Sequence, residues 1–226
     1  MSLSAAASEL VDALHRARLV VFDFDGTLVD SNAIKQRAFA QCFAPEADRL
    51  EEIMAYCGTR HHAPRWEKFR HVYERILRKP YTPDVAAALM AQYAAQTTRQ
   101  IIAAPEIPGA AACLRMVSRA RATALLSSTP QKTLQDIISQ RGWSAYFGHI
   151  QGAPVNKMEW LAQARHAQGG GAGAVLFFGD TPEDSDAAGA AGCAFVGVGA
   201  GALLPGIGWT LPDWRALDLR EDETSS

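Results

Sequence analysis

The sequence predicts an α/β protein with a doubly wound, Rossmann-like parallel sheet and an inserted all-helical domain. From residue 105 onward, segments with strand composition alternate with segments of helical spacing. This alternation is typical of a parallel sheet covered by helices on both faces. Residues 31–104 show helical patterns without a convincing strand. We therefore expect an α/β core made of residues 1–30 and 105–226, interrupted by a helical cap at 31–104.

The first strand of the core is predicted within "RLVVFDF", residues 18–24, after a short helical segment at 4–17. Its run of β-branched and aromatic residues has no polar alternation, which is typical of a strand buried on both faces of a parallel sheet. The run ends in Asp23 and Asp25, which point the same way because residues two apart in a strand share a face. Gly26 then permits a tight turn.

The predicted helices of the insert have amphipathic spacing. They cover residues 31–43, 47–57, 65–79 and 83–103. Within the third, Trp66, Phe69 and Tyr73 stand at helical spacing, so we expect them in the core of the insert.

After the insert, strands and helices are predicted in turn. Strand patterns occur at 122–128, 146–152, 174–180 and 194–199, and helical patterns at 130–142, 157–167 and 182–192. The segment at 104–120 is predicted to be a loop with Pro105, Pro108 and Gly109 that opens a helix. The loop "QGGGAGA" at 168–174 lacks the following Gly-Lys-Ser/Thr of a phosphate-binding P-loop. The polar tail at 218–226 is predicted to be disordered.

Composition excludes several classes of function. The chain of 226 residues is 48% hydrophobic and has a formal net charge of −2, so no basic field favours nucleic acid. No apolar run approaches the roughly 20 residues of a membrane helix, and the N-terminus lacks a secretory signal pattern. We expect a cytoplasmic monomer or small homo-oligomer that binds neither nucleic acid nor membranes. Reduced thiols are expected at all four cysteines, which are Cys42, Cys57, Cys113 and Cys193.

Chemistry-bearing residues gather where the predicted strands end, which is where ligands bind in open α/β sheets. These residues are Asp23, Asp25, Ser127, Ser128, Lys157, Asp180 and Asp184. Four carboxylates do not remain ionised together without a cation, and oxygen ligands without histidine or cysteine favour Mg²⁺. The sequence therefore predicts a magnesium site built from Asp23, Asp25, Asp180 and Asp184.

The order of these residues resembles that of a known family. "DFDGTLVDS", "LLSSTP", the isolated Lys157 and "GDTPEDSDAAGAAGC" look like the four successive motifs of the haloacid dehalogenase-like (HAD) hydrolase superfamily. The resemblance runs from about residue 18 to 198. An insert directly after the first motif is similar to members with a small helical cap, such as phosphoglycolate phosphatase-like and β-phosphoglucomutase-like enzymes. It implies a Mg²⁺-dependent phosphatase acting on a small soluble phosphate through an aspartyl-phosphate.

The resemblance also implies a role for each matching residue. Asp23 would be the nucleophile, Asp25 the general acid/base, Ser127 a hydrogen-bond donor to the phosphoryl group, Lys157 its counter-charge, Asp180 a metal ligand and Asp184 a support of the metal site. One departure concerns the third motif, where Met158 stands in place of the proline that often follows the lysine. Lys132 is the nearest competitor for that role.

Substrate contacts are predicted in both parts of the chain. Main-chain amides of the turn at Gly26 can donate to phosphate oxygens, and Ser128 is a further candidate. In the insert, the basic segment at 60–71 suggests a surface for an anionic substrate, with Arg65 and Lys68 as the best candidates. The adjacent His61 and His62 do not predict a metal site, because neighbouring side chains point apart.

Several alternatives remain open or disfavoured at this point. Dehalogenases of the superfamily lack the second aspartate and phosphonate-cleaving members replace it with a small residue, whereas Asp25 is present. A phosphomutase of the β-phosphoglucomutase kind would use the same motifs. A non-hydrolytic phospho-aspartate signalling module would share the Asp, Ser and Lys arrangement, but it would lack the long insert after the first strand.

Overall fold

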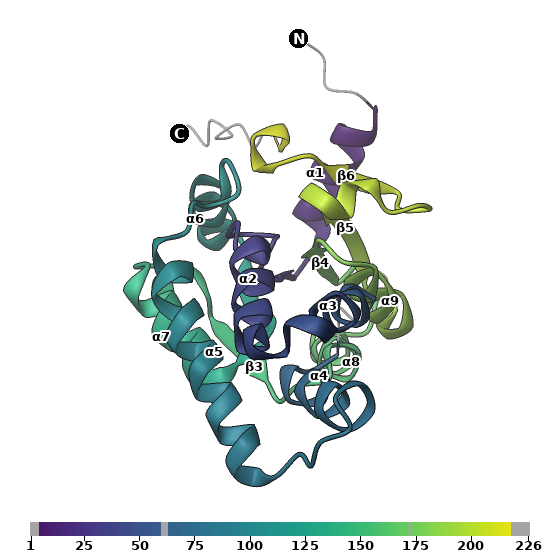
Figure 1. Cartoon of the computed structure of the whole chain (residues 1–226). Coiled ribbons are helices and arrows are strands. Elements are labelled where there is room, and N and C mark those ends of the chain that lie inside the picture. The colour runs from purple at the N-terminus through teal and green to yellow at the C-terminus, as the bar shows by residue number, and fades with distance from the viewer. Residues whose placement is uncertain (1–4, 60–62, 172, 218–226) are drawn as a thin grey trace, which may run out of the picture. The chain divides into compact units, whose positions relative to one another are not determined.

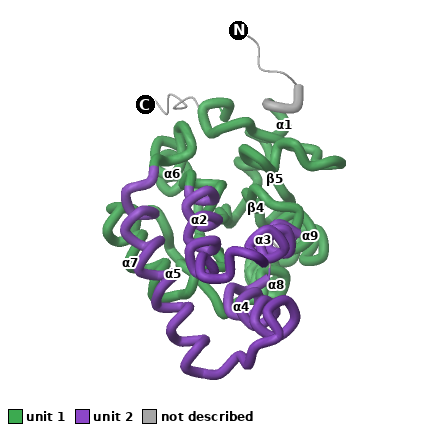
Figure 2. Tube along the Cα trace, viewed as in Figure 1, with its two compact units in different colours: residues 1–30, 105–226 green, residues 31–104 purple. Residues whose placement is uncertain are grey.

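The structure is a computed structural model and describes residues 5–59, 63–171 and 173–217 (Figure 1). The chain divides into two compact units, which Figure 2 colours separately. One unit comprises residues 1–30 and 105–226 and is called the α/β unit here. The other comprises residues 31–104 and is called the helical unit. Each is described by itself.

The α/β unit contains a six-stranded sheet with the strand order β3-β2-β1-β4-β5-β6. Its strands are β1 (Leu19–Phe22), β2 (Ala122–Pro130), β3 (His149–Ala153), β4 (Val175–Gly179), β5 (Ala194–Val198) and β6 (Trp209–Leu211). Every neighbouring pair is parallel. The predicted parallel α/β core is confirmed, as is the position of the helical insertion between β1 and β2.

Helices precede, connect or follow the strands of this sheet. They are α1 (Ala5–Arg16), α6 (Ala110–Ala120), α7 (Gln131–Gln140), α8 (Lys157–Ala167) and α9 (Pro182–Ala191), with short turns η3 (Ser144–Tyr146), η4 (Gly199–Leu203) and η5 (Trp214–Ala216). On one face of the sheet, Val21 and Phe177 belong to a buried cluster with Leu161 of α8 and Ala188 of α9.

The next residues along these strands, Phe22 and Phe178, stack on each other with ring centroids 5.4 Å apart. Because side chains of a strand alternate between faces, β1 and β4 are buried on both sides. This burial explains their unbroken apolar sequences.

Two features of the sheet differ from the prediction. Strand β2 continues through Ser127 and Thr129 to Pro130, with an irregular register against β3 between Leu126 and Pro130. The strand therefore extends two residues, Thr129 and Pro130, beyond the predicted segment at 122–128. Strand β6 was not predicted, because its three residues are too few to show a periodic pattern.

The helical unit is all-helical in its described residues. Its elements are α2 (Asn32–Cys42), η1 (Ala44–Arg49), α3 (Leu50–Gly58), α4 (Arg65–His71), a π-helical turn η2 (Val72–Ile76) and α5 (Pro83–Ala103). Phe39, Phe43, Phe69 and Tyr93 form its aromatic core, with Phe39 and Phe69 stacked at 5.1 Å. The prediction for Phe69 is confirmed, and Tyr73 packs against the core from a partly buried position.

The prediction that Trp66 lies in this core is wrong, because its side chain is 49% exposed. Trp66 occupies the second position of α4, and its ring lies 5.1 Å from the Arg70 guanidinium. The helical spacing that it shares with Phe69 is imperfect, since residues three apart on a helix are separated by about 60° around the axis.

The four cysteines have free thiols, in line with the expected absence of a disulfide framework. Burial raises the pKa of Cys42 and of Cys57 to about 11, so both remain protonated thiols at neutral pH. In the part of the chain that the structure describes, no helix has the length and apolarity required to cross a membrane.

Candidate active site

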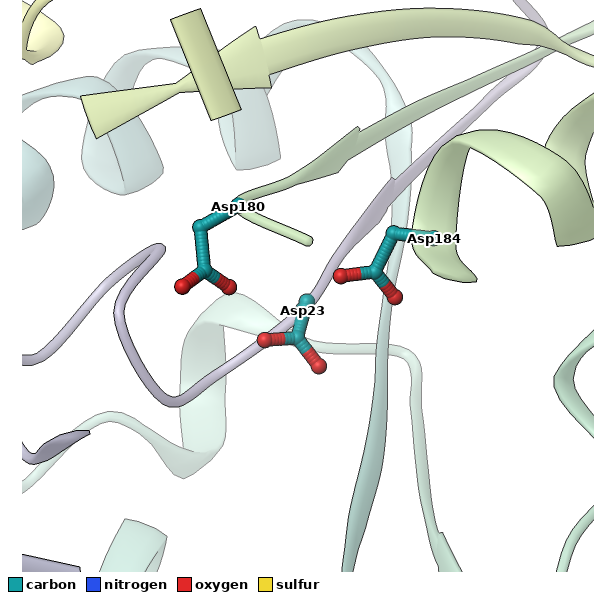
Figure 3. Close-up of side chains that lie close together, drawn as sticks. All are labelled: Asp23, Asp180 and Asp184. Atoms are coloured by element: carbon teal, nitrogen blue, oxygen red, sulfur yellow. The ribbon is translucent and has the colours of Figure 1, made fainter. Parts of the chain in front are cut away.

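Three aspartates converge at the carboxyl edge of the sheet in the α/β unit. Asp23 directly follows β1, Asp180 directly follows β4, and Asp184 lies in the first turn of α9. Their carboxylate oxygens offer three ligand atoms that all lie within 4.8 Å of one another. All three side chains are buried, and Figure 3 shows them directed toward a common point.

The register of the sheet brings the first two together. Phe22 of β1 pairs with Phe178 of β4, and the Asp23 amide donates to the Phe178 carbonyl at 2.8 Å. The two strands therefore end side by side, and each is followed within two residues by a carboxylate. Parallel pairing of two central strands is enough to build this half of the site.

Asp184 is held by the start of its own helix. Its amide donates to the Thr181 hydroxyl at 3.2 Å, and its carboxylate accepts from the Thr181 amide and hydroxyl at 3.3 and 2.6 Å. This reciprocal capping box fixes the side chain from one side. Gly179 leaves room for it, since a Cβ at that position would lie 2.6 Å from the Asp184 Cβ.

Lys157 is the cation in contact with this cluster. Its Nζ atom lies 2.6 Å from Asp23 Oδ1 and 2.7 Å from Asp184 Oδ1. Burial lowers the pKa of Lys157, but the carboxylates of Asp184 and Asp23 outweigh it and hold that pKa above its ordinary value. Lys157 is therefore charged. Lys132, the competitor considered from the sequence, is exposed on α7.

Lys157 is also the first residue of α8, where a positive charge faces the positive end of the helix dipole. The Asn156 side chain caps the helix by accepting from the Glu159 amide at 3.2 Å. The N-terminus of α8 by itself disfavours a positive charge, and the ion pairs with Asp23 and Asp184 offset this cost. This placement indicates that the carboxylates, not α8, determine where its ammonium group lies.

Negative charge exceeds positive charge in the cluster. The pKa of Asp23 is raised to about 8, mainly by burial; Lys157 opposes this rise, and Asp184, Asp180 and Asp25 add to it. One lysine thus does not balance three buried carboxylates. A divalent cation would supply the missing charge, and a donor set made only of oxygens fits Mg²⁺.

Thr27 lies between two of the carboxylates and was not singled out from the sequence. Its hydroxyl is within reach of Asp180 Oδ1 at 3.3 Å and of Asp23 Oδ2 at 3.5 Å, and the side chain is fully buried. A single hydroxyl proton can serve one of them at a time. The signal that the sequence offers is the position of Thr27 in the turn directly after Asp23 and Asp25.

Asp25 is not a member of the converging group. Its Oδ2 atom accepts from the Thr129 hydroxyl at 3.1 Å and lies 3.5 Å from the Ser127 hydroxyl. Ser127 in turn accepts from the Thr129 amide at 3.1 Å. The structure thus places the proposed acid/base beside two hydroxyls at the end of β2. Thr129 was missed because the irregular register of β2 is not visible in the sequence.

The other residues predicted to bind substrate in the α/β unit lie at its turn and strand ends. Gly26 has a φ of 84°, in the left-handed region that favours glycine. Its amide donates to the Val29 carbonyl at 2.8 Å, so it is used within the turn. Ser128 is exposed, whereas the neighbouring Ser127 is buried. Their contact with substrate stays a prediction.

In the helical unit, the two predicted substrate-binding residues belong to α4. The Arg65 guanidinium lies over the Tyr93 ring at 3.8 Å from its centroid, and Lys68 is half-buried. Arg60, His61 and His62 of the same basic segment lie outside the described residues. The assignment of Arg65 and Lys68 to substrate binding also stays a prediction.

Comparison with known proteins identifies the family. Residues 17–192 match the model of the haloacid dehalogenase-like hydrolases. The chain belongs to this family. The match includes the carboxylate cluster and Lys157 and ends just after α9.

Individual relatives agree with this assignment. The chain is 29% identical over 174 residues to a phosphoglycolate phosphatase from Synechococcus elongatus, covering 75% of this chain and 77% of the relative. The solved structure of a "predicted phosphoglycolate phosphatase" from Haemophilus somnus has a TM-score of 0.66 at 20% identity, over 88% and 95% of the two chains. A HAD-family hydrolase from Bacillus subtilis bound to magnesium has a TM-score of 0.66 at 17% identity, over 89% and 97%.

Proposed function

We propose that this hydrolase cleaves phosphate monoesters of small soluble molecules, with Asp23 as the nucleophile. The observation that carries the proposal is the contact of Lys157 with Asp23 at 2.6 Å beside a converging group of buried carboxylates. A carboxylate attacks phosphorus only when the negative charge of both partners is offset. Lys157 can offset part of this charge from its position in the cluster.

Asp23, Asp180 and Asp184 would hold the magnesium ion, as the convergence of their oxygens supports. The ion, when bound, supplies positive charge that offsets both the nucleophile and the phosphate. Asp25 was also predicted as a ligand, and this stays a prediction; its carboxylate accepts from the Thr129 hydroxyl and lies 3.5 Å from the Ser127 hydroxyl. We propose the acid/base role for that side chain.

Two steps would complete the reaction. In the first, an Asp23 oxygen forms a bond to phosphorus, the bond from phosphorus to the ester oxygen breaks, and Asp25 donates its proton to that oxygen. In the second, Asp25 accepts a proton from water as the water oxygen attacks phosphorus, and Asp23 is released. The Ser127 hydroxyl would donate to the transferring phosphoryl group.

Phosphoglycolate is the first substrate to examine, because a curated relative carries that activity in its name. Substrate selection would rest with residues outside the cluster, for which Arg65 and Lys68 of the helical unit and Gly26 and Ser128 of the α/β unit are the candidates. Cationic side chains on the helical unit suit a substrate with a second anionic group.

The experiment is a phosphate-release screen over small phospho-acids, sugar phosphates and nucleotides, with Mg²⁺, with EDTA and with Ca²⁺. We expect turnover with Mg²⁺, none after chelation, and inhibition by Ca²⁺, which accepts a looser and higher coordination. Full activity after exhaustive chelation would contradict the metal site.

A phosphomutase is the second candidate, favoured by one structural neighbour. A Thermotoga maritima protein described provisionally as a β-phosphoglucomutase has a TM-score of 0.60 at 20% identity, over 88% of this chain and 96% of that one. Turnover of a sugar phosphate to its isomer that requires a sugar bisphosphate primer would select the mutase. Release of inorganic phosphate without a primer would select the phosphatase.

A further inference from the structure

We propose that Trp214 is a positioning residue of the active site, acting through the turn that carries Thr27. This inference rests on the proposed magnesium-dependent function. Trp214 lies 22 residues beyond the end of the family match at residue 192, in the short turn η5 that follows β6. Its side chain is 2% exposed, which makes it one of the most deeply buried large residues of the α/β unit.

The Trp214 indole holds the turn after β1 directly. Its Nε1 atom donates to the Thr27 carbonyl at 2.8 Å in a buried hydrogen bond. The hydroxyl of the same residue, Thr27, lies within 3.5 Å of both Asp23 and Asp180. Thr27 therefore links Trp214 to the cluster: its main-chain carbonyl accepts from the indole, and its hydroxyl lies beside two of the carboxylates.

The ring also supports the two strands that end in these carboxylates. It packs against Phe22 and Phe178 with ring centroids 5.5 and 5.0 Å apart. Phe22 immediately precedes Asp23, and Phe178 stands two residues before Asp180. Trp214 thus touches β1, β4 and the turn between Asp23 and Val29, and its loss would release all three.

A third contact ties in the chain as it returns from the helical unit. The Trp214 amide donates to the Pro108 carbonyl at 3.1 Å. The segments at 28–30 and 105–107 are themselves paired, with a bridge between Val29 and Glu106. Gly109 permits this close approach, since a Cβ there would lie 3.0 Å from the Arg215 amide. Through Thr27 and Pro108, Trp214 therefore contacts both stretches of the α/β unit that adjoin residues 31–104.

The turn that presents Trp214 is fixed from outside the core. Asp213 caps η5 by accepting from the Arg215 amide at 2.9 Å. Its carboxylate also pairs with the exposed Arg215 side chain at 2.6 Å. Asp213 thus offers a way to loosen Trp214 without changing a buried side chain.

The test compares Trp214→Phe with Trp209→Phe, the same substitution at a half-buried position in the same segment. Phenylalanine keeps an aromatic ring but removes the N–H donor to Thr27. We expect the magnesium dissociation constant, measured by calorimetry without substrate, to rise about 10-fold in Trp214→Phe, as for the loss of one buried hydrogen bond. Trp209→Phe should bind the ion as the wild type does.

Further variants separate positioning from folding. Asp213→Ala leaves the buried core unchanged and should weaken magnesium binding by a few-fold. In a Thr27→Val background, Trp214→Phe should add little further loss, because two residues that act through one path are not additive. Unchanged magnesium affinity in Trp214→Phe and Asp213→Ala would overturn the inference. A wild type that binds no magnesium would overturn the proposed function itself.

Discussion

The two units of the molecule both bury hydroxyls but differ in whether they bury carboxylates. Among the described residues, all four buried carboxylates, which are Asp23, Asp25, Asp180 and Asp184, belong to the α/β unit. The helical unit buries the side chains of Ser31 and Thr97, and the Thr97 hydroxyl donates to the Tyr93 carbonyl at 2.8 Å. Hydroxyls satisfied by the backbone cost little, whereas buried carboxylates cost stability unless they are paired.

The α/β unit therefore carries the reactive groups, whereas the core of the helical unit consists of packed apolar and aromatic side chains. In the α/β unit, the strand ends fix charges where water is excluded and Lys157 balances only part of them. In the helical unit, Phe69 contacts both Phe39 and Tyr93, and none of the described charged residues is buried. We therefore expect substitutions in the first to change the reaction and substitutions in the second to change stability or substrate choice.

The largest effect is expected at Asp23. Asp23→Asn keeps the shape of the side chain and removes the attacking charge, so turnover should fall by about 10⁴-fold or more. Asp186→Asn, an exposed position on α9, is the matched control and should retain activity. Phosphate release and circular dichroism measure the two outcomes. Near-normal turnover by a folded Asp23→Asn would refute the covalent mechanism.

A smaller and more selective effect is expected at Thr129, whose hydroxyl contacts Asp25. Thr129→Val should lower kcat/KM about 10-fold for alkyl phosphates, whose leaving oxygen needs a proton from Asp25. p-Nitrophenyl phosphate has a leaving group that needs no such proton, so its hydrolysis should change much less.

Thr129→Ser keeps the hydroxyl and should restore the alkyl phosphate rate. Equal losses on both esters in Thr129→Val, with no rescue by serine, would mean that Thr129 supports the fold of β2 and not the acid/base.

In the helical unit, Lys68→Ala and Arg65→Met should affect the physiological substrate only. We expect a KM increase of about 5-fold for that substrate, from the loss of one charge-assisted contact, and little change for p-nitrophenyl phosphate. Arg65→Met also removes the stacking on Tyr93, worth about 0.5–1 kcal/mol of stability.

The exposed Arg75 provides a control, and Arg75→Ala should leave both substrates unaffected. Steady-state kinetics on the two substrates test whether Arg65 and Lys68 contribute to substrate binding. If neither Lys68→Ala nor Arg65→Met alters KM, substrate selection lies with other residues of the chain.

The smallest effect concerns stability without metal. The pKa of Asp23 is raised to about 8 from 3.8, so between these values the folded protein keeps a proton that the unfolded chain has released. The free energy of unfolding contributed by Asp23 therefore falls as pH rises from about 4 to 8. Asp23→Asn removes this loss, and in EDTA it should unfold about 2–6 °C higher than the wild type at pH 8.

The difference between the two proteins should shrink toward about pH 3, below the ordinary pKa of 3.8, where Asp23 is mostly protonated in both states. Added Mg²⁺ should reverse the order at pH 8, because only the wild type offers the charged ligand. Thermal unfolding followed at both pH values tests this. An Asp23→Asn variant that is less stable in EDTA at pH 8 would show that the ion pair with Lys157 outweighs burial and repulsion.

Local pattern was sufficient for most elements of this fold. The helical runs of both units and four of the six strands match their predicted segments closely, because each has enough residues to show a period or a continuous apolar run. Strand β6, the extension of β2 and the exposure of Trp66 were not foreseen. Each depends on which neighbour a segment meets, and that information lies elsewhere in the chain.

By itself, the sequence determined that the carboxylates of Asp23 and Asp180 would meet, because both follow apolar strands of a parallel sheet and such strands end at one edge. Only the tertiary structure decided which hydroxyls and which aromatic ring support them. Thr27, Thr129 and Trp214 reach the site through a turn, an irregular strand and a C-terminal segment, none of which has a periodic signature. The ends of β1 and β4 follow from local pattern, whereas the contacts that hold a side chain in place are set by distant segments that pack against it.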